Sequence, residues 1–177
     1  QGDILTLDPQ AQNEGMTIAA SSYVYEPLVE YDQEFKITPA LATEWENTSD
    51  TIWRFKLREG VKFHDGSDFT ADDVVFSIQR ALAPTSNFKA YVNGIKEVRK
   101  VDDHTVELET EGPNPVLLRQ LTNVFIMSKA WSEANNATAP QDFANQQETF
   151  SARNTNGTGA YKLEGREVDI RTTFVEN

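Results

Sequence analysis

The chain has 177 residues, of which 38% are hydrophobic and 25% charged, a composition typical of a folded globular protein with its own core. Its formal net charge of −12 repels phosphate backbones and anionic lipid, so we expect neither a nucleic acid nor a membrane surface as partner. The absence of Cys excludes disulfides, thiolate metal sites and Cys nucleophiles. No apolar run approaches the ~20 residues of a membrane-spanning helix, so direct membrane insertion is not expected either.

The N-terminal part of the chain alternates short structured pieces with turns. Residues 11–15 are polar and include a glycine, which is typical of a loop. Residues 17–25 are weakly helical and rich in aromatics, and Pro27 limits how far such a helix extends. Residues 28–31 predict a short strand.

The strongest local signals lie between residues 51 and 82. Apolar and charged residues alternate over residues 52–57, which predicts a half-buried strand, and residues 64–68 form a polar turn. A helix is expected after Thr70, because Thr70 and Asp73 have the spacing of a capping box. The expected apolar stripe of this helix consists of Val74, Val75, Ile78 and Leu82.

The second half of the chain predicts two hairpins and two short helices. The hairpins are expected at residues 96–110 and 160–175, and the helices at residues 116–121 and 128–134. Residues 135–156 are rich in Asn, Gln, Ala and Thr and contain few core residues. This composition predicts a surface segment or a linker.

The sequence contains no recognisable catalytic or metal-binding constellation. His64 and His104 lack the spacing of a zinc site, and we expect both to be exposed in turns. The glycines of residues 157–159 lack the third glycine of a phosphate-binding loop, and a strand rather than a helix is expected after them. No nucleophile elbow occurs. We therefore expect no enzyme activity, no cofactor and no bound metal.

The aromatic residues are the more informative group, because rings with a polar tip suit a site that buries a small ligand. Most of them are expected in the core. Phe88 and Tyr91 follow a loop, so a position in the core and a position lining a cleft remain open alternatives for both.

Several short motifs occur in a fixed order along the chain. They are residues 7–9 (Leu-Asp-Pro), 24–29, 39–45, 53–66, 69–74 and 156–163 (Asn-Gly-Thr-Gly-Ala-Tyr-Lys-Leu). Together they resemble the family-5 solute-binding proteins of bacterial ABC importers, the dipeptide-, oligopeptide- and nickel-binding group. The resemblance covers nearly the whole chain, and it rests on the agreement of several spaced motifs.

The resemblance implies an α+β fold of the periplasmic-binding-protein type II kind, in which two lobes close on a ligand. Residues 1–41 would form the first segment of lobe one, residues 42–152 an inserted mixed-sheet subdomain, and residues 153–177 the return to lobe one. Family members are much longer than 177 residues. We therefore expect this chain to be an N-terminal fragment that lacks the second lobe.

The resemblance also implies where the ligand lies. The loop after the Leu-Asp-Pro motif meets the ligand in this family, and here that loop contains Asn13, Glu14 and Gly15. In some members an aromatic after the main helix approaches the ligand. Tyr91 is the best match for that aromatic in this sequence, with Phe88 second.

The implied function is that of the substrate-binding component of an ABC importer. Such a protein captures a peptide or similar small solute outside the cytoplasmic membrane, as a monomer, and delivers it to the permease subunits. The implied location is the periplasm, or the outer face of the membrane, by a tether, in a Gram-positive host. The alternative is a ligand-sensing module of a signalling system that uses the same fold.

Overall fold

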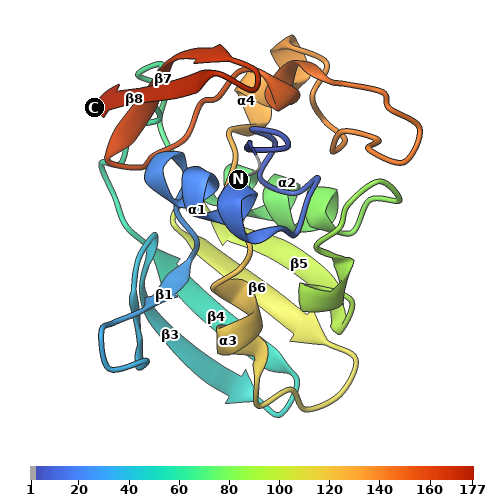
Figure 1. The fold of residues 1–177 in the computed structure, drawn as a ribbon. Helices are drawn as coiled ribbons and strands as arrows, with labels where there is room; N and C mark the ends of the chain where they lie inside the picture. The colour runs from blue at the N-terminus through green and yellow to red at the C-terminus, as the bar shows by residue number, and fades with distance from the viewer. Residues whose placement is uncertain (1–2) are drawn as a thin grey trace.

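The computed structural model describes residues 3–177, and its centre is a four-stranded antiparallel sheet in the order β3-β4-β6-β5 (Figure 1). The strands of this sheet are β3 (Ala42–Ser49), β4 (Ile52–Leu57), β5 (Ile95–Asp102) and β6 (Thr105–Thr110). Helix α2 (Ala71–Ala81) packs against β5 and β6. Among the described residues, no helix has the length and apolar character needed to cross a lipid bilayer.

Smaller elements surround this central unit. They are α1 (Gly15–Val24), the hairpin of β1 (Val29–Tyr31) and β2 (Ile37–Pro39), η1 (Lys89–Tyr91), α3 (Leu117–Leu121), α4 (Lys129–Ala134), η2 (Phe150–Ala152), and the hairpin of β7 (Tyr161–Glu167) and β8 (Arg171–Glu176). Helix α1 contacts β7, and α2 contacts α4. In Figure 1 the two helices α1 and α2 therefore lie between the sheet and the β7–β8 hairpin. The predicted hairpins and short helices are confirmed.

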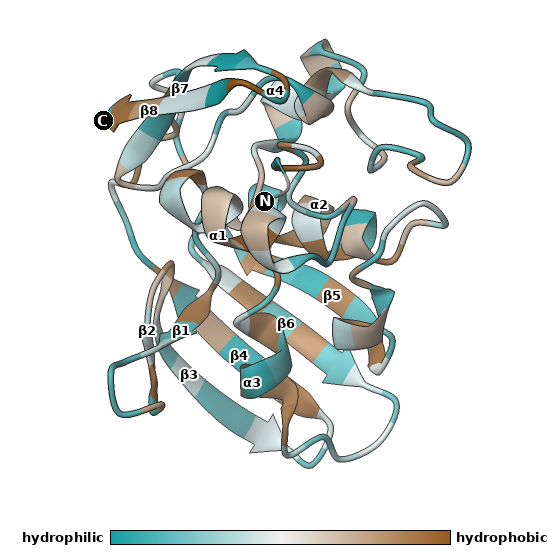
Figure 2. Cartoon of the chain, viewed as in Figure 1, coloured by the Kyte–Doolittle hydropathy of each residue, from teal (hydrophilic) through white to brown (hydrophobic). Residues whose placement is uncertain are grey.

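The sheet forms because its strands alternate apolar and charged residues. Phe55 and Val106 are opposite each other in β4 and β6 and are fully buried in the main core. On the other face, Arg54 of β4 pairs with Glu107 of β6 at 2.7 Å, and Arg99 of β5 pairs with Glu109 at 2.9 Å. The alternating brown and teal bands on these strands in Figure 2 show the same division.

Helix α2 begins as its sequence predicts. The backbone N–H of Thr70 donates to the Asp73 carboxylate at 2.9 Å, and the Thr70 hydroxyl accepts from the N–H of Asp72 at 3.3 Å. Val74 and Ile78 are fully buried in the core. Leu82 was expected in the same stripe but is 38% exposed, because it lies at the C-cap, after the last helical turn.

A buried ion pair between Asp8 and Arg80 connects the N-terminal loop to α2. Both side chains are 0% exposed, and the guanidinium donates to both carboxylate oxygens, at 2.9 and 2.6 Å. The carboxylate also accepts from the Ser151 hydroxyl at 2.7 Å and from the N–H groups of Gln10 and Gln141 at 3.0 and 3.1 Å. Both oxygens of the carboxylate are therefore satisfied without water.

Arg80 is satisfied in the same way. Its three remaining N–H groups donate to the side-chain oxygen of Gln10 and to the carbonyl oxygens of Ala137 and Ala139, each at 3.1 Å. The segment that carries these carbonyls was predicted to be a surface segment or linker, and that prediction is wrong for several of its residues. Ala137, Gln141, Ser151, Ala152 and Asn156 are buried. Ala137 and Ser151 supply oxygens to the buried guanidinium, and the N–H of Gln141 donates to Asp8. The other two satisfy buried backbone groups, since the Ala152 carbonyl accepts from the N–H of Leu7 and the Asn156 side chain from the N–H of Asp65.

Two glycines let the chain at residues 157–159 approach the C-terminal end of α1. A Cβ added to Gly157 would lie 2.0 Å from the carbonyl oxygen of Val24, and one added to Gly159 would lie 2.5 Å from the carbonyl oxygen of Tyr23. The N–H of Gly159 donates to the Val24 carbonyl at 2.8 Å. These glycines therefore serve close backbone packing at the end of α1 rather than phosphate binding.

We predict that Asp8→Asn lowers the free energy of unfolding by about 3–5 kcal/mol, because it leaves the Arg80 charge buried without a counter-charge. Urea unfolding of the purified chain measures the change. Asp68→Asn is the matched control, since Asp68 pairs with Lys62 at the surface, where both side chains are more than half exposed. This control should change stability by about 1 kcal/mol or less. Equal losses for the two variants would contradict the prediction.

We also predict a pH dependence for this pair. Burial alone would raise the pKa of Asp8, but the charge and hydrogen bonds of Arg80, together with Ser151 and Gln10, hold it below its ordinary value. The stability that Asp8 contributes is therefore complete above the unfolded pKa of about 3.9 and is lost as pH falls further through the folded pKa. The stability difference between wild type and Asp8→Asn should be constant near neutral pH and shrink below about pH 4. Burial raises the pKa of Asp73, so Asp73 changes the stability with pH in the opposite direction. Because Asp73 is present in both proteins, its effect cancels when their stabilities are compared. A difference that stays constant down to pH 2 would contradict the prediction.

Candidate ligand-binding site

The structure brings together two of the predicted site residues from distant parts of the sequence. The side-chain amide of Asn13 donates to the Tyr91 hydroxyl oxygen at 3.1 Å, across 78 residues of sequence, and this contact is exposed. The loop before α1 and the loop after α2 are also joined by their backbones, since the N–H of Asn87 donates to the carbonyl of Gln10 at 3.1 Å. The Asn87 side-chain amide donates to the carbonyl of Ala11.

The Asn13–Tyr91 pair leaves two groups for a ligand. Because the Tyr91 oxygen accepts from Asn13, its own O–H can donate to a further partner. The side-chain oxygen of Asn13 accepts no hydrogen bond from residues 3–177. The pair therefore presents one donor and one acceptor side by side, a pattern that matches the N–H and C=O of one residue in an extended peptide.

The buried ring of Phe88 packs against the ring of Tyr91. The two rings have centroids 5.7 Å apart, and Phe88 is only 1% exposed. Of the two positions left open for Phe88, the structure shows the one in the core, so Phe88 does not line a cleft within this chain. η1 turns the chain between the two residues, so that Phe88 enters the core while Tyr91 remains half-buried at the surface.

Glu14 and Gly15 shape the site at the start of α1. The Glu14 carboxylate accepts from the N–H groups of Met16 and Thr17 at 2.9 and 3.0 Å, so Glu14 is the N-cap of the helix. These hydrogen bonds, the one from Met16 foremost, lower the pKa of Glu14 and keep it charged. A Cβ added to Gly15 would meet no atom within 4 Å, so the surface above it is open. Glu14 thus orients the loop, and Gly15 leaves room beside it.

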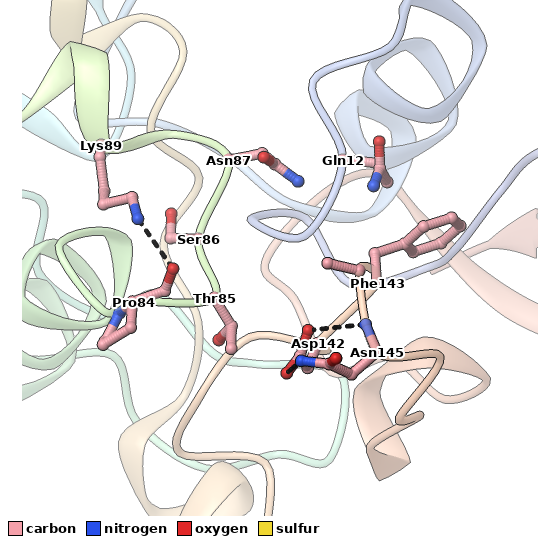
Figure 3. Close-up of a pocket in the computed structure, with 10 residues that line it drawn as sticks. Gln12, Pro84, Thr85, Ser86, Asn87, Lys89, Asp142, Phe143 and Asn145 are labelled. Atoms are coloured by element: carbon pink, nitrogen blue, oxygen red, sulfur yellow. Dashed lines mark hydrogen bonds between the residues drawn. The ribbon is translucent and has the colours of Figure 1, made fainter.

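A cavity of about 630 Å³ adjoins this loop (Figure 3). Its lining includes Gln12, Thr85, Ser86, Asn87, Lys89 and Asp142. Figure 3 shows that these side chains come from three separate segments of the chain, with the Lys89 ammonium donating to the carbonyl of Pro84 at 2.7 Å. The volume lies within the range of small-molecule sites. Sequence patterns did not predict this cavity, because Ser, Thr, Asn and Asp are also the ordinary residues of turns.

Both histidines lie in turns, as expected from the sequence, but they are half-buried rather than exposed. The Nε2 of His64 lies 2.8 Å from the carbonyl oxygen of Gly159, and the carbonyl of His104 accepts from the N–H of Leu57 at 2.8 Å. Each therefore holds two backbone segments together. In the part of the chain from residue 3 onward, no three His, Cys, Asp or Glu side chains are arranged to hold a metal ion.

We predict that the Asn13–Tyr91 hydrogen bond, which joins the two loops, stabilises the folded chain. In a double-mutant cycle of Asn13→Ala and Tyr91→Phe, the coupling in the free energy of unfolding should be about 0.5–1 kcal/mol. The control cycle pairs Asn13→Ala with Tyr161→Phe. Tyr161 packs on Tyr23 near the C-terminal end of α1, so these two changes should be additive. A coupling below the error of the control cycle would refute the link.

The sequence of this chain is similar to those of known proteins. The periplasmic murein peptide-binding protein MppA of Escherichia coli K12 is 30% identical over 175 residues, which cover 87% of this chain and 30% of MppA. Heme-binding protein A of Haemophilus influenzae is 33% identical over 178 residues, covering 89% of this chain and 32% of that protein. The chain thus spans about a third of the length of these curated relatives.

Solved structures give the same result. The structure of MoaA from A. tumefaciens R10, in complex with mannopinic acid, matches with a TM-score of 0.85 and 30% sequence identity, over 100% of this chain and 36% of MoaA. The predicted fold class, an α+β part of a type II periplasmic-binding-protein lobe, is confirmed. Residues 36–177 match the family described as bacterial extracellular solute-binding proteins, family 5 Middle. The chain therefore belongs to the family-5 bacterial extracellular solute-binding proteins.

Proposed function

We propose that this chain is the lobe-one part of the substrate-binding component of an ABC importer. The protein captures a peptide or similar small solute outside the cytoplasmic membrane and delivers it to the permease subunits. The observation that carries this proposal is the exposed Asn13–Tyr91 pair, which joins two loops across 78 residues of sequence and leaves a donor and an acceptor side by side. Family membership supports the same role.

We also propose a division of the chain into lobe-one segments and an inserted subdomain. Residues 1–41 and 153–177 belong to lobe one, and residues 42–152 form the inserted subdomain; residues 1 and 2 lie outside the described structure. Two observations support this division. The four-stranded sheet lies wholly within residues 42–152, and the β7–β8 hairpin packs on α1, which belongs to the first segment.

The proposed action is binding without covalent chemistry. The relatives are named for different ligands, a murein peptide for MppA and heme for heme-binding protein A. Proteins of this family therefore bind different kinds of solute. We propose a peptide-like solute for this chain because the Asn13 oxygen can accept from the N–H, and the Tyr91 O–H can donate to the C=O, of one residue in an extended peptide. Gly15 adds open space at the same loop. The proposed protein acts as a monomer in the periplasm, or tethered to the outer face of the membrane in a Gram-positive host.

Calorimetric titration of the full-length protein with di- and oligopeptides, sugars, opines and nickel chelates tests the proposal. We expect micromolar binding of a peptide-like solute. Tyr91→Phe keeps the ring and removes the O–H, so it should weaken binding about 5- to 10-fold. Tyr23→Phe is the matched control, since Tyr23 is exposed and lies against Tyr161 and Phe174, and it should leave binding unchanged. Binding of another solute class without any peptide binding would overturn the substrate class.

A further inference from the structure

The chain contains two Asn-Gly pairs, Asn93-Gly94 and Asn156-Gly157. An asparagine side chain that precedes glycine is open to attack by the next backbone nitrogen, because glycine has no side chain to hinder that nitrogen and its backbone adopts many conformations. The two pairs are chemically the same, so their sequence does not distinguish them. The folded structure places them in opposite surroundings.

The pair Asn93-Gly94 lies in the turn between η1 and β5, and Asn93 is exposed. Within residues 3–177, the Asn93 side chain makes no hydrogen bond and the Gly94 N–H donates to no acceptor. A Cβ added to Gly94 would meet only the side-chain amide nitrogen of Asn114, at 3.7 Å, which is an ordinary contact. Both groups that would react are therefore free of hydrogen bonds, and the space around them is open.

The pair Asn156-Gly157 is held in place. Asn156 is 2% exposed, and its side-chain oxygen accepts from the N–H of Asp65 at 3.0 Å. The Gly157 carbonyl accepts from the N–H of His64 at 2.9 Å, and a Cβ added to Gly157 would lie 2.0 Å from the carbonyl oxygen of Val24. The Asn156 side chain cannot turn toward the next nitrogen without breaking its hydrogen bond to Asp65. Its reaction therefore requires local unfolding of this segment.

We propose that Asn93 is a site of spontaneous deamidation in the folded protein, and that the fold protects Asn156 from the same reaction. The Gly94 backbone nitrogen forms a bond to the side-chain carbonyl carbon of Asn93, and the side-chain amide nitrogen leaves as ammonia with the proton that Gly94 loses. The product is a five-membered succinimide. Water then adds its hydroxyl to one of the two ring carbonyl carbons and its proton to the ring nitrogen, and the ring C–N bond breaks. The result is aspartate or isoaspartate at position 93.

The modified turn lies next to Tyr91. The N–H of Ile95 donates to the carbonyl of Val92 at 2.9 Å, and only Asn93 and Gly94 lie between these two residues. Either product adds a negative charge to the turn. Isoaspartate also adds a methylene to the backbone between the two hydrogen-bonded groups, so it should break this hydrogen bond and destabilise the start of β5.

The test incubates the folded full-length protein at neutral pH and physiological temperature, and follows the tryptic peptides of residues 90–96 and 154–162 by mass spectrometry. Fragment ions assign the modified position, and enzymatic methylation of isoaspartate separates the two products. In the folded protein Asn156 should deamidate at least about tenfold more slowly than Asn93, because its reaction requires local opening. In the same protein unfolded in guanidinium chloride the two rates should agree within about threefold, because that protection is lost.

Gly94→Ala is the matched variant, because the added methyl group fits in the structure but hinders attack by its backbone nitrogen. It should slow the modification of Asn93 at least about fivefold, and circular dichroism checks that it keeps the fold. An Asn93 that stays intact in the folded protein but deamidates in the unfolded one would refute the site. Equal rates at Asn93 and Asn156 in the folded protein would refute the protection by the fold. An unchanged rate in Gly94→Ala would refute the Gly94 nitrogen as the attacking atom. Solute binding enters none of these measurements, so their failure leaves the importer proposal standing.

Discussion

The ion pair of Asp8 and Arg80 is the contact on which the arrangement of the whole chain depends. A charge pair that is fully out of water is tolerated only when the remaining donors and acceptors are also satisfied. Here that requirement brings four separate segments to one point, the loop after Leu7, the last turn of α2, the backbone after α4 and the hydroxyl of Ser151. None of these segments can shift without leaving a buried polar group unpaired.

The position of the loop that carries Asn13, the proposed ligand-binding loop, depends on contacts with this buried pair and with α2. Asp8 and Gln10 fix the start of the loop, because the Gln10 amide donates to the Ser77 carbonyl of α2 at 2.9 Å. The Glu14 carboxylate fixes its end by capping α1. Asn13 lies between these two fixed ends and meets Tyr91 at the surface. Buried contacts therefore hold Asn13 and Tyr91 in place, and if these residues bind the ligand as proposed, less order has to be imposed on binding.

The sequence predicts the local features of this fold well and the long-range ones poorly. The capping box of Thr70 and Asp73 and the strand alternation around Phe55 depend on residues close in sequence, and both are confirmed. The burial of Arg80 is not predicted, because a cation in the last turn of a helix is ordinarily a surface residue and its partner Asp8 is 72 residues away. Phe88 and Tyr91 show the same limit. Both are aromatic and lie on either side of one turn, and only the packing of the surrounding core decides that the first is buried and the second reaches the surface.

The distances in sequence that the Asp8 carboxylate spans have a consequence for the order of events during translation. Its partners lie 72, 133 and 143 residues further along the chain. When α2 leaves the ribosome, Arg80 has its counter-charge but not yet the carbonyls of residues 137 and 139 or the hydroxyl of residue 151. A nascent chain that ends before residue 151 therefore cannot form all the hydrogen bonds of the buried Asp8–Arg80 pair. Because so many contacts are non-local, we expect folding to be slow and to be completed only after most of these 177 residues have been synthesised.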